Sequence, residues 1–148
     1  METFPGPAEP WWVTGFCDGE ASFTFSRSGS QIALYFAIKL IASDRPVLEQ
    51  LAAYFGAGKL YAVAPVSPRR NSGFTKSAVL YRVTRHDELP RVTDHFDRYP
   101  LQSQKLAAYK IWRGMVEIKR NFRGRNREAL QELALALSAA QSRNQSWR

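Results

Sequence analysis

Two stretches near the beginning of the chain alternate between apolar and polar residues. The segment ASFTFS alternates, and apolar residues then occupy every second position over 34–40. A period of two is typical of a strand with one buried face. The segment SRSGS between them is typical of a turn, so residues 21–41 are predicted to form a hairpin. A second hairpin is predicted over 59–66 and 78–85, with a basic loop between its strands.

Around the hairpins, apolar residues recur every three or four positions, which is the spacing of helices with one buried face. The first helix is predicted over 10–20, because Pro10 suits a first helical turn. The second is predicted to begin with Ser43 as its N-cap and to stop at Gly56. Three further helices are predicted from the segments HDELPRVTDHFDRY, SQKLAAYKIWRGMVEIKR and NREALQELALALSAAQ.

The order of these elements predicts one α+β domain. A helix, two strands, a second helix, two more strands and the last helices can form a four-stranded antiparallel sheet packed under helices. The domain is predicted over 10–140, with tails at 1–9 and 141–148. The sheet face turned away from the helices is left polar and open to solvent. Its residues are predicted to be Thr24, Ser26, Tyr35, Lys39, Tyr61 and Arg82.

Charge is distributed unevenly along the chain. The net charge is +8, and residues 100–148 hold 10 Lys and Arg against 3 Asp and Glu. A polyanionic partner explains such a concentration, and nucleic acid is the commonest one. A basic solvated surface with no partner is the alternative.

Composition also restricts the compartment. No apolar run approaches the length of about 20 residues that a membrane helix needs, so no membrane partner is expected. The chain start lacks the basic and apolar regions of a signal peptide. The single cysteine, Cys17, indicates a reducing compartment, and a cytoplasmic location is predicted. Arginine outnumbers lysine 15 to 6, which favours a bacterial or archaeal host over an AT-rich organelle. The two histidines, His86 and His95, are expected at the surface or in loops rather than as ligands.

The segment GFCDGEASFTF joins the first helix to the first strand. Gly15 and Gly19 lie four residues apart, so they share one helix face, which Trp12 and Phe16 flank. Glycine is unfavourable inside helices, and two on one face suggest that another backbone approaches closely. The helix also ends on two carboxylates, where its dipole favours cations. This placement is weak evidence for a bound cation near Glu20.

This cluster and this order of elements resemble the LAGLIDADG homing endonuclease family. The family motif corresponds to VTGFCDGEA at 13–21. The segments FAIKLIASDRPVLEQLAAYFGAGKLY and RYPLQSQKLAAYKIW continue the resemblance in the family's order, so that it covers roughly 10–137. Only one copy of the motif is present. The resemblance therefore implies a homodimer in which two motif helices pack together through Trp12, Gly15, Phe16 and Gly19.

The resemblance also implies an active site at the end of the motif helix. Glu20 occupies the family's metal-binding acidic position, and the backbone carbonyl of Gly19 is expected beside it as a second ligand. Mg²⁺ is the expected metal, with Mn²⁺ tolerated, because hard cations prefer oxygen ligands. Lys105 matches the family's basic active-site residue. Asp18 is expected to have a structural role.

Two positions depart from the family pattern. Many members carry a glutamine near the end of the second strand, where this chain has Lys39, Leu40 and Ile41. Leu40 cannot order water, so either Lys39 substitutes or this element is absent. Ala21 replaces the usual last glycine of the motif, which adds only a methyl group.

DNA contacts are expected from the polar sheet face, the hairpin tips and the basic segment KRNFRGRNR. Basic residues of that segment suit phosphate contacts, which carry no sequence information. On the sheet, Arg27, Lys39 and Arg82 are expected to reach guanine edges and Gln31 adenine. The expected DNA-binding residues are Thr24, Ser26, Arg27, Gln31, Tyr35, Lys39, Tyr61, Arg69, Arg70, Lys76, Arg82, Lys119, Arg120, Arg123 and Arg125.

The expected function is that of an intron-encoded, site-specific endonuclease. A homodimer would cut both strands of a long, pseudo-palindromic DNA target, and family resemblance implies short 3′ overhangs. One alternative is an intron maturase or DNA-binding regulator that does not cut. Another is an unrelated RNA-binding α+β module, which leaves the acidic helix end unexplained.

Overall fold

The computed structural model describes residues 8–65, 76–122 and 127–145 of the chain. Four of the expected DNA-binding residues, Arg69, Arg70, Arg123 and Arg125, lie outside these ranges. The elements are α1 (Pro10–Glu20), β1 (Ala21–Ser28), β2 (Gln31–Ile41), a 3-10 turn (Ala42–Asp44), α2 (Arg45–Phe55), β3 (Lys59–Val63), β4 (Ala78–Val83), α3 (Leu89–Arg98), α4 (Lys105–Phe122) and α5 (Arg127–Gln145). This order confirms the predicted α+β fold.

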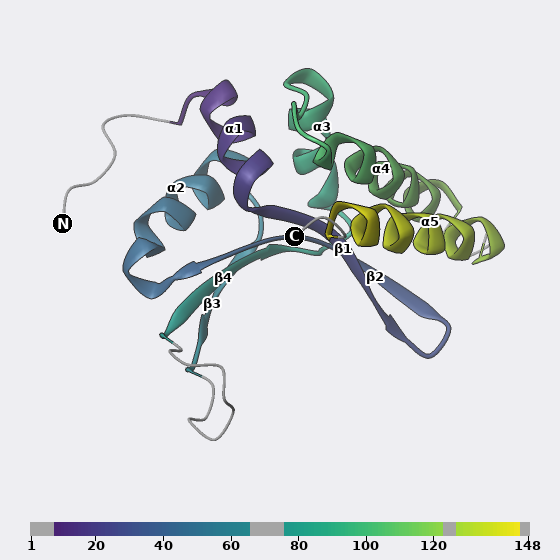
Figure 1. Cartoon of the computed structure of the whole chain (residues 1–148), viewed down its shortest axis with the longest axis horizontal. Coiled ribbons are helices and arrows are strands. Elements are labelled where there is room, and N and C mark those ends of the chain that lie inside the picture. Colours follow the sequence, from purple (N-terminus) through teal and green to yellow (C-terminus); the bar gives the residue numbers. More distant parts are fainter. Residues whose placement is uncertain (1–7, 66–75, 123–126, 146–148) are drawn as a thin grey trace.

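The four strands form one antiparallel sheet in the order β1-β2-β4-β3. The two hairpins therefore join side by side, with β2 and β4 at the centre. In Figure 1 the sheet arches like a saddle beneath the helices, and the hairpins extend downward at its two sides. α2 covers one end of the sheet, α3, α4 and α5 cover the other, and α1 descends between them to the sheet centre.

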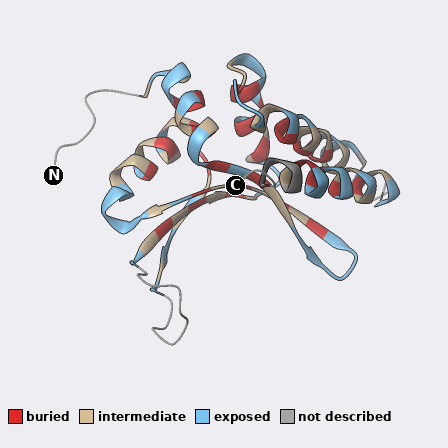
Figure 2. Ribbon diagram, in the orientation of Figure 1, coloured by how far each residue is buried: buried red, intermediate tan, exposed pale blue. Residues whose placement is uncertain are grey.

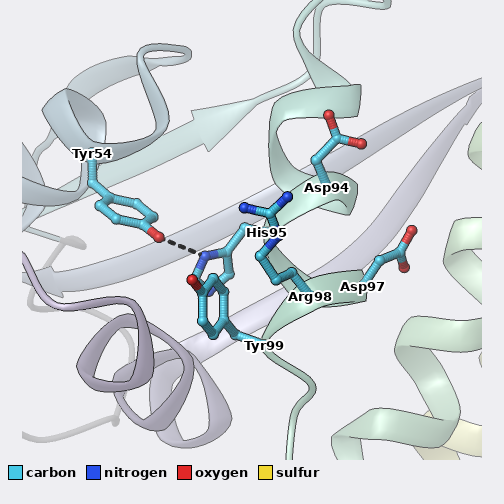
Figure 3. Close-up of a pocket in the computed structure, with 6 residues that line it drawn as sticks. All are labelled: Tyr54, Asp94, His95, Asp97, Arg98 and Tyr99. Atoms are coloured by element: carbon cyan, nitrogen blue, oxygen red, sulfur yellow. Dashed lines mark hydrogen bonds between the residues drawn. The ribbon is translucent and has the colours of Figure 1, made fainter.

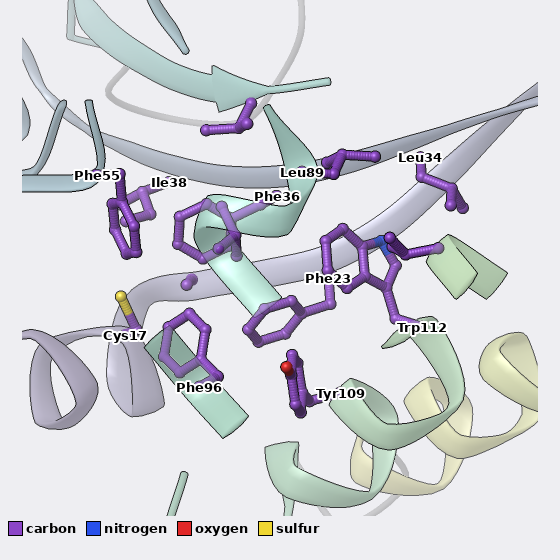
Figure 4. Packing of buried hydrophobic residues seen from close by; sticks show 14 of the residues in the cluster. Cys17, Phe23, Leu34, Phe36, Ile38, Phe55, Leu89, Phe96, Tyr109 and Trp112 are labelled. Atoms are coloured by element: carbon purple, nitrogen blue, oxygen red, sulfur yellow. The ribbon is translucent and has the colours of Figure 1, made fainter. Parts of the chain in front are cut away.

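The core lies between the sheet and the helices (Figure 2). Its centre is the ring of Phe23 on β1, whose centroid lies 5.2–5.4 Å from those of Phe36, Phe96 and Trp112 (Figure 4). Trp112 also donates a hydrogen bond from Nε1 to the backbone oxygen of Thr24, at 3.0 Å, so its polar edge is satisfied. These contacts fix β1 against α4 and thereby hold the junction between α1 and β1.

The ends of α2 follow local rules, with one difference from the prediction. Ser43 is not the N-cap: it lies within the 3-10 turn, and Asp44 takes the cap position. Gly56 ends the helix at φ 62°, as predicted. Gly58 has φ 85°, and a Cβ there would lie 2.6 Å from Cε1 of Tyr81. Only glycine fits this entry to β3 without displacing the buried tyrosine.

The predicted domain boundary at residue 140 falls inside α5. That helix continues to Gln145. Gln141 donates a hydrogen bond from Nε2 to the backbone oxygen of Phe23, at 2.9 Å. The first residue of the predicted tail therefore contacts β1, an edge strand of the sheet.

Candidate active site and nucleic-acid interface

α1 buries one side and leaves the other exposed. Val13, Thr14 and Cys17 are fully covered, whereas Gly15 and Gly19 are exposed. Apart from the neighbouring backbone of α1, a Cβ added at either glycine would meet no atom of the described residues within 4 Å. Packing within this chain therefore does not require the two glycines. An approaching second backbone would use the space they leave.

Asp18 joins the end of α1 to the segment before α4. Its carboxylate accepts hydrogen bonds from the backbone nitrogens of Gln102 and Ser103, at 2.9 and 3.1 Å, and from Oγ of Ser103, at 2.7 Å. Ser103 Oγ in turn accepts from the backbone nitrogen of Lys105, at 3.1 Å. Asp18 thus has the structural role expected for it.

This connection brings Lys105 to the C-terminal end of α1. Its ammonium donates from Nζ to the backbone oxygen of Cys17, at 3.1 Å. A cation there satisfies a terminal carbonyl and suits the helix dipole. Glu20 ends the same helix with its side chain exposed. The structure therefore places the two expected catalytic residues, Glu20 and Lys105, at one end of α1.

The β1–β2 ladder relates this end of α1 to Lys39. Ala21 pairs with Ile38, and both side chains are buried on the core side. Glu20, which precedes Ala21, belongs to α1 and lies outside the ladder, whereas Lys39, which follows Ile38, is exposed on the polar face. Leu40 lies on the core side and packs against the hydrophobic cluster. Of Lys39 and Leu40, only Lys39 therefore presents a polar group on the open face of the sheet.

The donors at the end of α1 fit a hard cation only in part. The Glu20 carboxylate and the terminal carbonyls, Gly19 among them, are oxygen ligands of the kind that Mg²⁺ prefers. Within the described residues, however, no group of three or more His, Cys, Asp and Glu side chains lies close enough to hold a metal. The Asp18 carboxylate at the same helix end is engaged by Gln102 and Ser103, so the exposed carboxylate there is that of Glu20.

The polar sheet face carries the residues that alternation predicted. Thr24 pairs with Tyr35, and Arg82 lies opposite Ala37 and Lys59. Ser26 and Tyr35 join their hydroxyl groups at 2.8 Å across the strands. At the end of β2, Lys39 and Lys76 line one hollow of about 400 Å³. The face thus combines hydroxyl groups, aromatic rings and cations.

Two expected DNA-binding residues are oriented differently. Arg27 pairs with the buried Ile32, on the helix side of the sheet, where it donates a hydrogen bond to Gln131 of α5 and lies 5.3 Å from the ring centroid of Phe25. Its side chain therefore lies on the side of the sheet opposite the polar face, and its contact with guanine stays a prediction. Lys119 donates to the backbone oxygen of Ile32, and burial lowers its pKa. Its ammonium is therefore bound to β2, whereas Arg120 is exposed.

His95 is buried in α3, contrary to the expectation of a surface or loop position. Its Nε2 lies 2.9 Å from Oγ1 of Thr14, and its Nδ1 lies 2.9 Å from the hydroxyl oxygen of Tyr54. Thr14 gives its one proton to the backbone oxygen of Tyr99, at 2.8 Å, so Nε2 must donate and Nδ1 must accept. Burial lowers the pKa of His95 to about 4.

This hydrogen-bonded chain connects α1 to α2 and α3. Figure 3 shows Tyr54 of α2 pointing at His95. Both residues line a hollow of about 660 Å³, whose other lining residues are Asp94, Asp97, Arg98 and Tyr99. An isolated histidine in an amphipathic helix carries no sequence signal for this role, because its partners come from two distant helices.

A family model described as LAGLIDADG endonuclease matches residues 13–116, from α1 into α4. The chain belongs to the LAGLIDADG endonuclease family. The match includes Asp18, Glu20 and Lys105, the residues that meet at the end of the motif helix.

Relatives of this LAGLIDADG chain occur in fungi. A Podospora anserina protein, described as an uncharacterized 50.9 kDa protein in ND4 intron 1, is 30% identical over 122 residues, covering 76% of this chain and 25% of the relative. A Neurospora crassa protein, described as probable intron-encoded endonuclease 3, is 28% identical over 111 residues, covering 70% and 19%. The chain thus spans a quarter or less of these relatives. Their fungal source weakens the expectation of a bacterial or archaeal host.

The LAGLIDADG meganuclease I-AabMI, solved bound to uncleaved DNA, matches with a TM-score of 0.70 and 31% identity. The match covers 85% of this chain and 42% of the meganuclease chain. This likeness confirms the fold. Within the described residues, no helix combines the length and apolar character that spanning a membrane would take.

Proposed function

We propose that this chain is one subunit of a homodimeric, site-specific DNA endonuclease. The observation that carries the proposal is the convergence of Glu20 and Lys105 at the end of α1, held by the Asp18 hydrogen bonds. Family membership supports a nuclease, and the matched meganuclease supports double-stranded DNA as the substrate.

The exposed side of α1 supports association with a second copy. Trp12 is 38% exposed and stacks on Phe16 with ring centroids 5.3 Å apart, beside the open positions at Gly15 and Gly19. Packing this surface against its symmetry mate would bury both aromatic residues. It would also bring together the two Glu20 carboxylates, whose repulsion at about 5 Å costs on the order of 3 kcal/mol at an effective dielectric near 20. A divalent cation removes that cost.

In this proposal, Glu20 and the carbonyl of Gly19 from each subunit hold Mg²⁺, with Mn²⁺ as a substitute. Such a cation polarises phosphate and lowers the pKa of bound water. Lys105 directs a positive charge to the same place, where it stabilises the charge that develops on phosphate oxygens. Lys39, near the end of β2, adds a second cation on the polar face.

The sheet face is proposed to lie in the major groove of DNA. Its curvature suits a rod-like ligand, and the two hairpins extend along its sides (Figure 1). Residues of the face include Thr24, Ser26, Gln31, Tyr35, Lys39, Tyr61 and Arg82, with Lys76 at the strand end and Arg120 on α4. Two-fold symmetry then gives a pseudo-palindromic target, and cleavage of both strands leaves 3′ overhangs. A cytoplasmic location stays a prediction.

The test compares cleavage with binding for Glu20→Gln. The target is first selected from a library of random DNA duplexes by its binding to the wild-type protein. Because glutamine is nearly isosteric but neutral, the variant should fold and bind, yet show no cleavage in Mg²⁺ or Mn²⁺. Glu49→Gln is the matched control, since Glu49 is an exposed carboxylate paired with Arg45 on α2, at 2.9 Å. It should cut like the wild type.

Full cleavage by Glu20→Gln would reject the assignment of the active site. Tight binding by the wild-type protein without cleavage in either metal would instead favour the maturase or regulator.

A further inference from the structure

An arginine clamp occupies the centre of the polar sheet face. It consists of Arg82 on β4 and the rings of Tyr35 on β2 and Tyr61 on β3. The guanidinium carbon of Arg82 lies 4.7 Å from the centroid of the Tyr35 ring and 5.2 Å from that of Tyr61. The strands on both sides of β4 therefore each supply one aromatic contact.

The clamp fixes the guanidinium without using its hydrogen-bond donors. Contacts with aromatic rings involve the π faces, whereas the N–H groups of arginine lie in the guanidinium plane. Within the described residues the side chain of Arg82 makes no hydrogen bond or ion pair, and its Nε is a buried nitrogen with no partner. No carboxylate of the described chain compensates its charge. An unpaired, buried donor is costly, so this arrangement indicates a ligand that supplies acceptors.

The support for the clamp is itself ordered. The hydroxyl of Tyr35 is hydrogen-bonded to Oγ of Ser26 at 2.8 Å, which holds that ring from β1. The residues directly opposite Arg82 are Ala37 on β2, whose side chain is a single methyl group, and Lys59 on β3. A long side chain normally loses rotamer entropy on binding, and much of that loss has already occurred here.

We propose that Arg82 is a specificity-determining residue that reads one guanine in each half of the DNA target, with Tyr35 and Tyr61 as its positioning residues. This inference rests on the proposed function. The in-plane fork of arginine matches O6 and N7 of guanine, which is the commonest specific contact in the major groove. Arg82 is on an inner strand, and this position favours contact with a base edge over contact with a phosphate. Phosphates border the groove and are therefore reached from the sides of the sheet.

The test selects binding sites from a random DNA duplex library in Ca²⁺, with folding checked by circular dichroism. The wild-type protein should require guanine at one symmetric pair of positions. Arg82→Ala should reduce that preference by about five- to 150-fold and leave the other positions unchanged. Arg82→Lys should lose it as well, because lysine keeps the charge but lacks the fork. Arg45→Ala removes an equal charge on α2 and should change no base preference.

Tyr61 separates positioning from direct contact. Tyr61→Phe keeps the ring and should keep the guanine preference, whereas Tyr61→Leu should weaken it in part. Loss of the preference in Tyr61→Phe, equal to that in Tyr61→Leu, would mean that the hydroxyl contacts DNA and would overturn the positioning role.

A chemical substitution in the DNA tests the contact without changing the protein. Replacing the required guanine by 7-deazaguanine removes the N7 acceptor, so the wild-type protein should bind the modified DNA more weakly. Arg82→Ala should bind the normal and the modified DNA with equal affinity. If Arg82→Ala fails to fold, the base preference of Arg82→Lys and the effect of 7-deazaguanine on the wild-type protein test the contact instead.

Two outcomes overturn the proposal, and they differ. If the wild-type protein selects no sequence at all, the proposed function fails and the inference fails with it. If it selects a target but Arg82→Ala binds every base at each position with uniformly weaker affinity, Arg82 contacts phosphate, and only the guanine assignment is refuted.

Discussion

The inner and outer sides of α1 differ in how far this chain alone satisfies them. On the inner side Thr14 is buried and bonded to both His95 and the backbone of Tyr99. On the outer side Trp11 is 56% exposed, and the position of a Cβ at Gly15 or Gly19 is empty. The inner contacts fix the fold, whereas the outer side is the surface through which we propose that a second copy packs. Folding and assembly therefore depend on different residues of one helix and are separable by mutation.

The largest expected effect follows from filling the outer side. Gly19→Leu should abolish dimerisation and cleavage, because the leucine occupies the space that a second α1 needs. The Cβ of the new side chain meets no atom of the described residues outside α1, and the change removes a helical glycine, so the free energy of unfolding of the monomer should rise by up to about 1 kcal/mol. Sedimentation measures the first effect and urea denaturation the second.

Ala53→Leu, at an exposed position on α2, is the matched control and should remain dimeric. A wild-type chain that sediments as a monomer at micromolar concentration, with and without DNA, would refute the proposal that the outer side of α1 is a dimer interface. So would a dimeric, active Gly19→Leu variant.

The next effect concerns the inner side and pH. His95 has a pKa of about 4 in the folded chain against about 6.5 when unfolded, because burial disfavours its charged form. Between these values the unfolded chain binds the extra proton. The contribution of His95 to the free energy of unfolding is therefore fully present above about pH 6.5. It is lost as the pH drops toward 4, and the loss is at most about 3 kcal/mol. Urea denaturation across this range measures the slope.

Carboxylates also titrate in this range, so the informative quantity is the difference between variants. His95→Gln should flatten the pH dependence between 4 and 6.5, whereas His86→Gln, at an exposed position, should leave it unchanged. Equal slopes for the wild type and His95→Gln would show that the histidine is not buried in its neutral form.

The smallest effect is expected where the two sides meet, at Asp18. Asp18→Asn removes one of the acceptor oxygens that hold Gln102 and Ser103, which should cost about 1 kcal/mol of stability. It should also slow cleavage indirectly, because Lys105 is then held less firmly. Asp44→Asn is the control, since that N-cap makes no side-chain hydrogen bond. Unchanged stability and cleavage in Asp18→Asn would remove its role in positioning Lys105.

Much of this architecture was predictable because it depends on local periodicity. Alternation along 21–41 predicted the strands and the side on which Thr24 and Tyr35 lie, and Gly56 marked the end of α2. The motif helix and Lys105 were found through the family resemblance. Their position at one helix end could be seen only in the structure. There, the Asp18 carboxylate accepts a hydrogen bond from Gln102, and Lys105 donates one to the backbone oxygen of Cys17, across most of the chain.

The failures share a physical cause, since each depends on tertiary neighbours. Arg27 was expected at the hairpin tip to reach a guanine edge, but alternation places it beside Ile32, where α5 offers Gln131 as an acceptor. Lys119 was assigned to phosphate because of its basic neighbours, but the Ile32 carbonyl binds it. His95 was expected at the surface because histidine is polar, yet its partners on α1 and α2 satisfy both ring nitrogens.

The Asp18 contacts also bear on the order in which the molecule folds. They join residues that are 84 and 85 positions apart in the chain. Closing so long a loop is entropically unfavourable until the intervening segments are arranged, and these segments include all four strands. We therefore expect Lys105 to reach the carboxylate end of α1 late in folding. A nascent chain released before the segment at 100–105 has emerged would carry the acidic motif without its cation, and hence without a completed catalytic end.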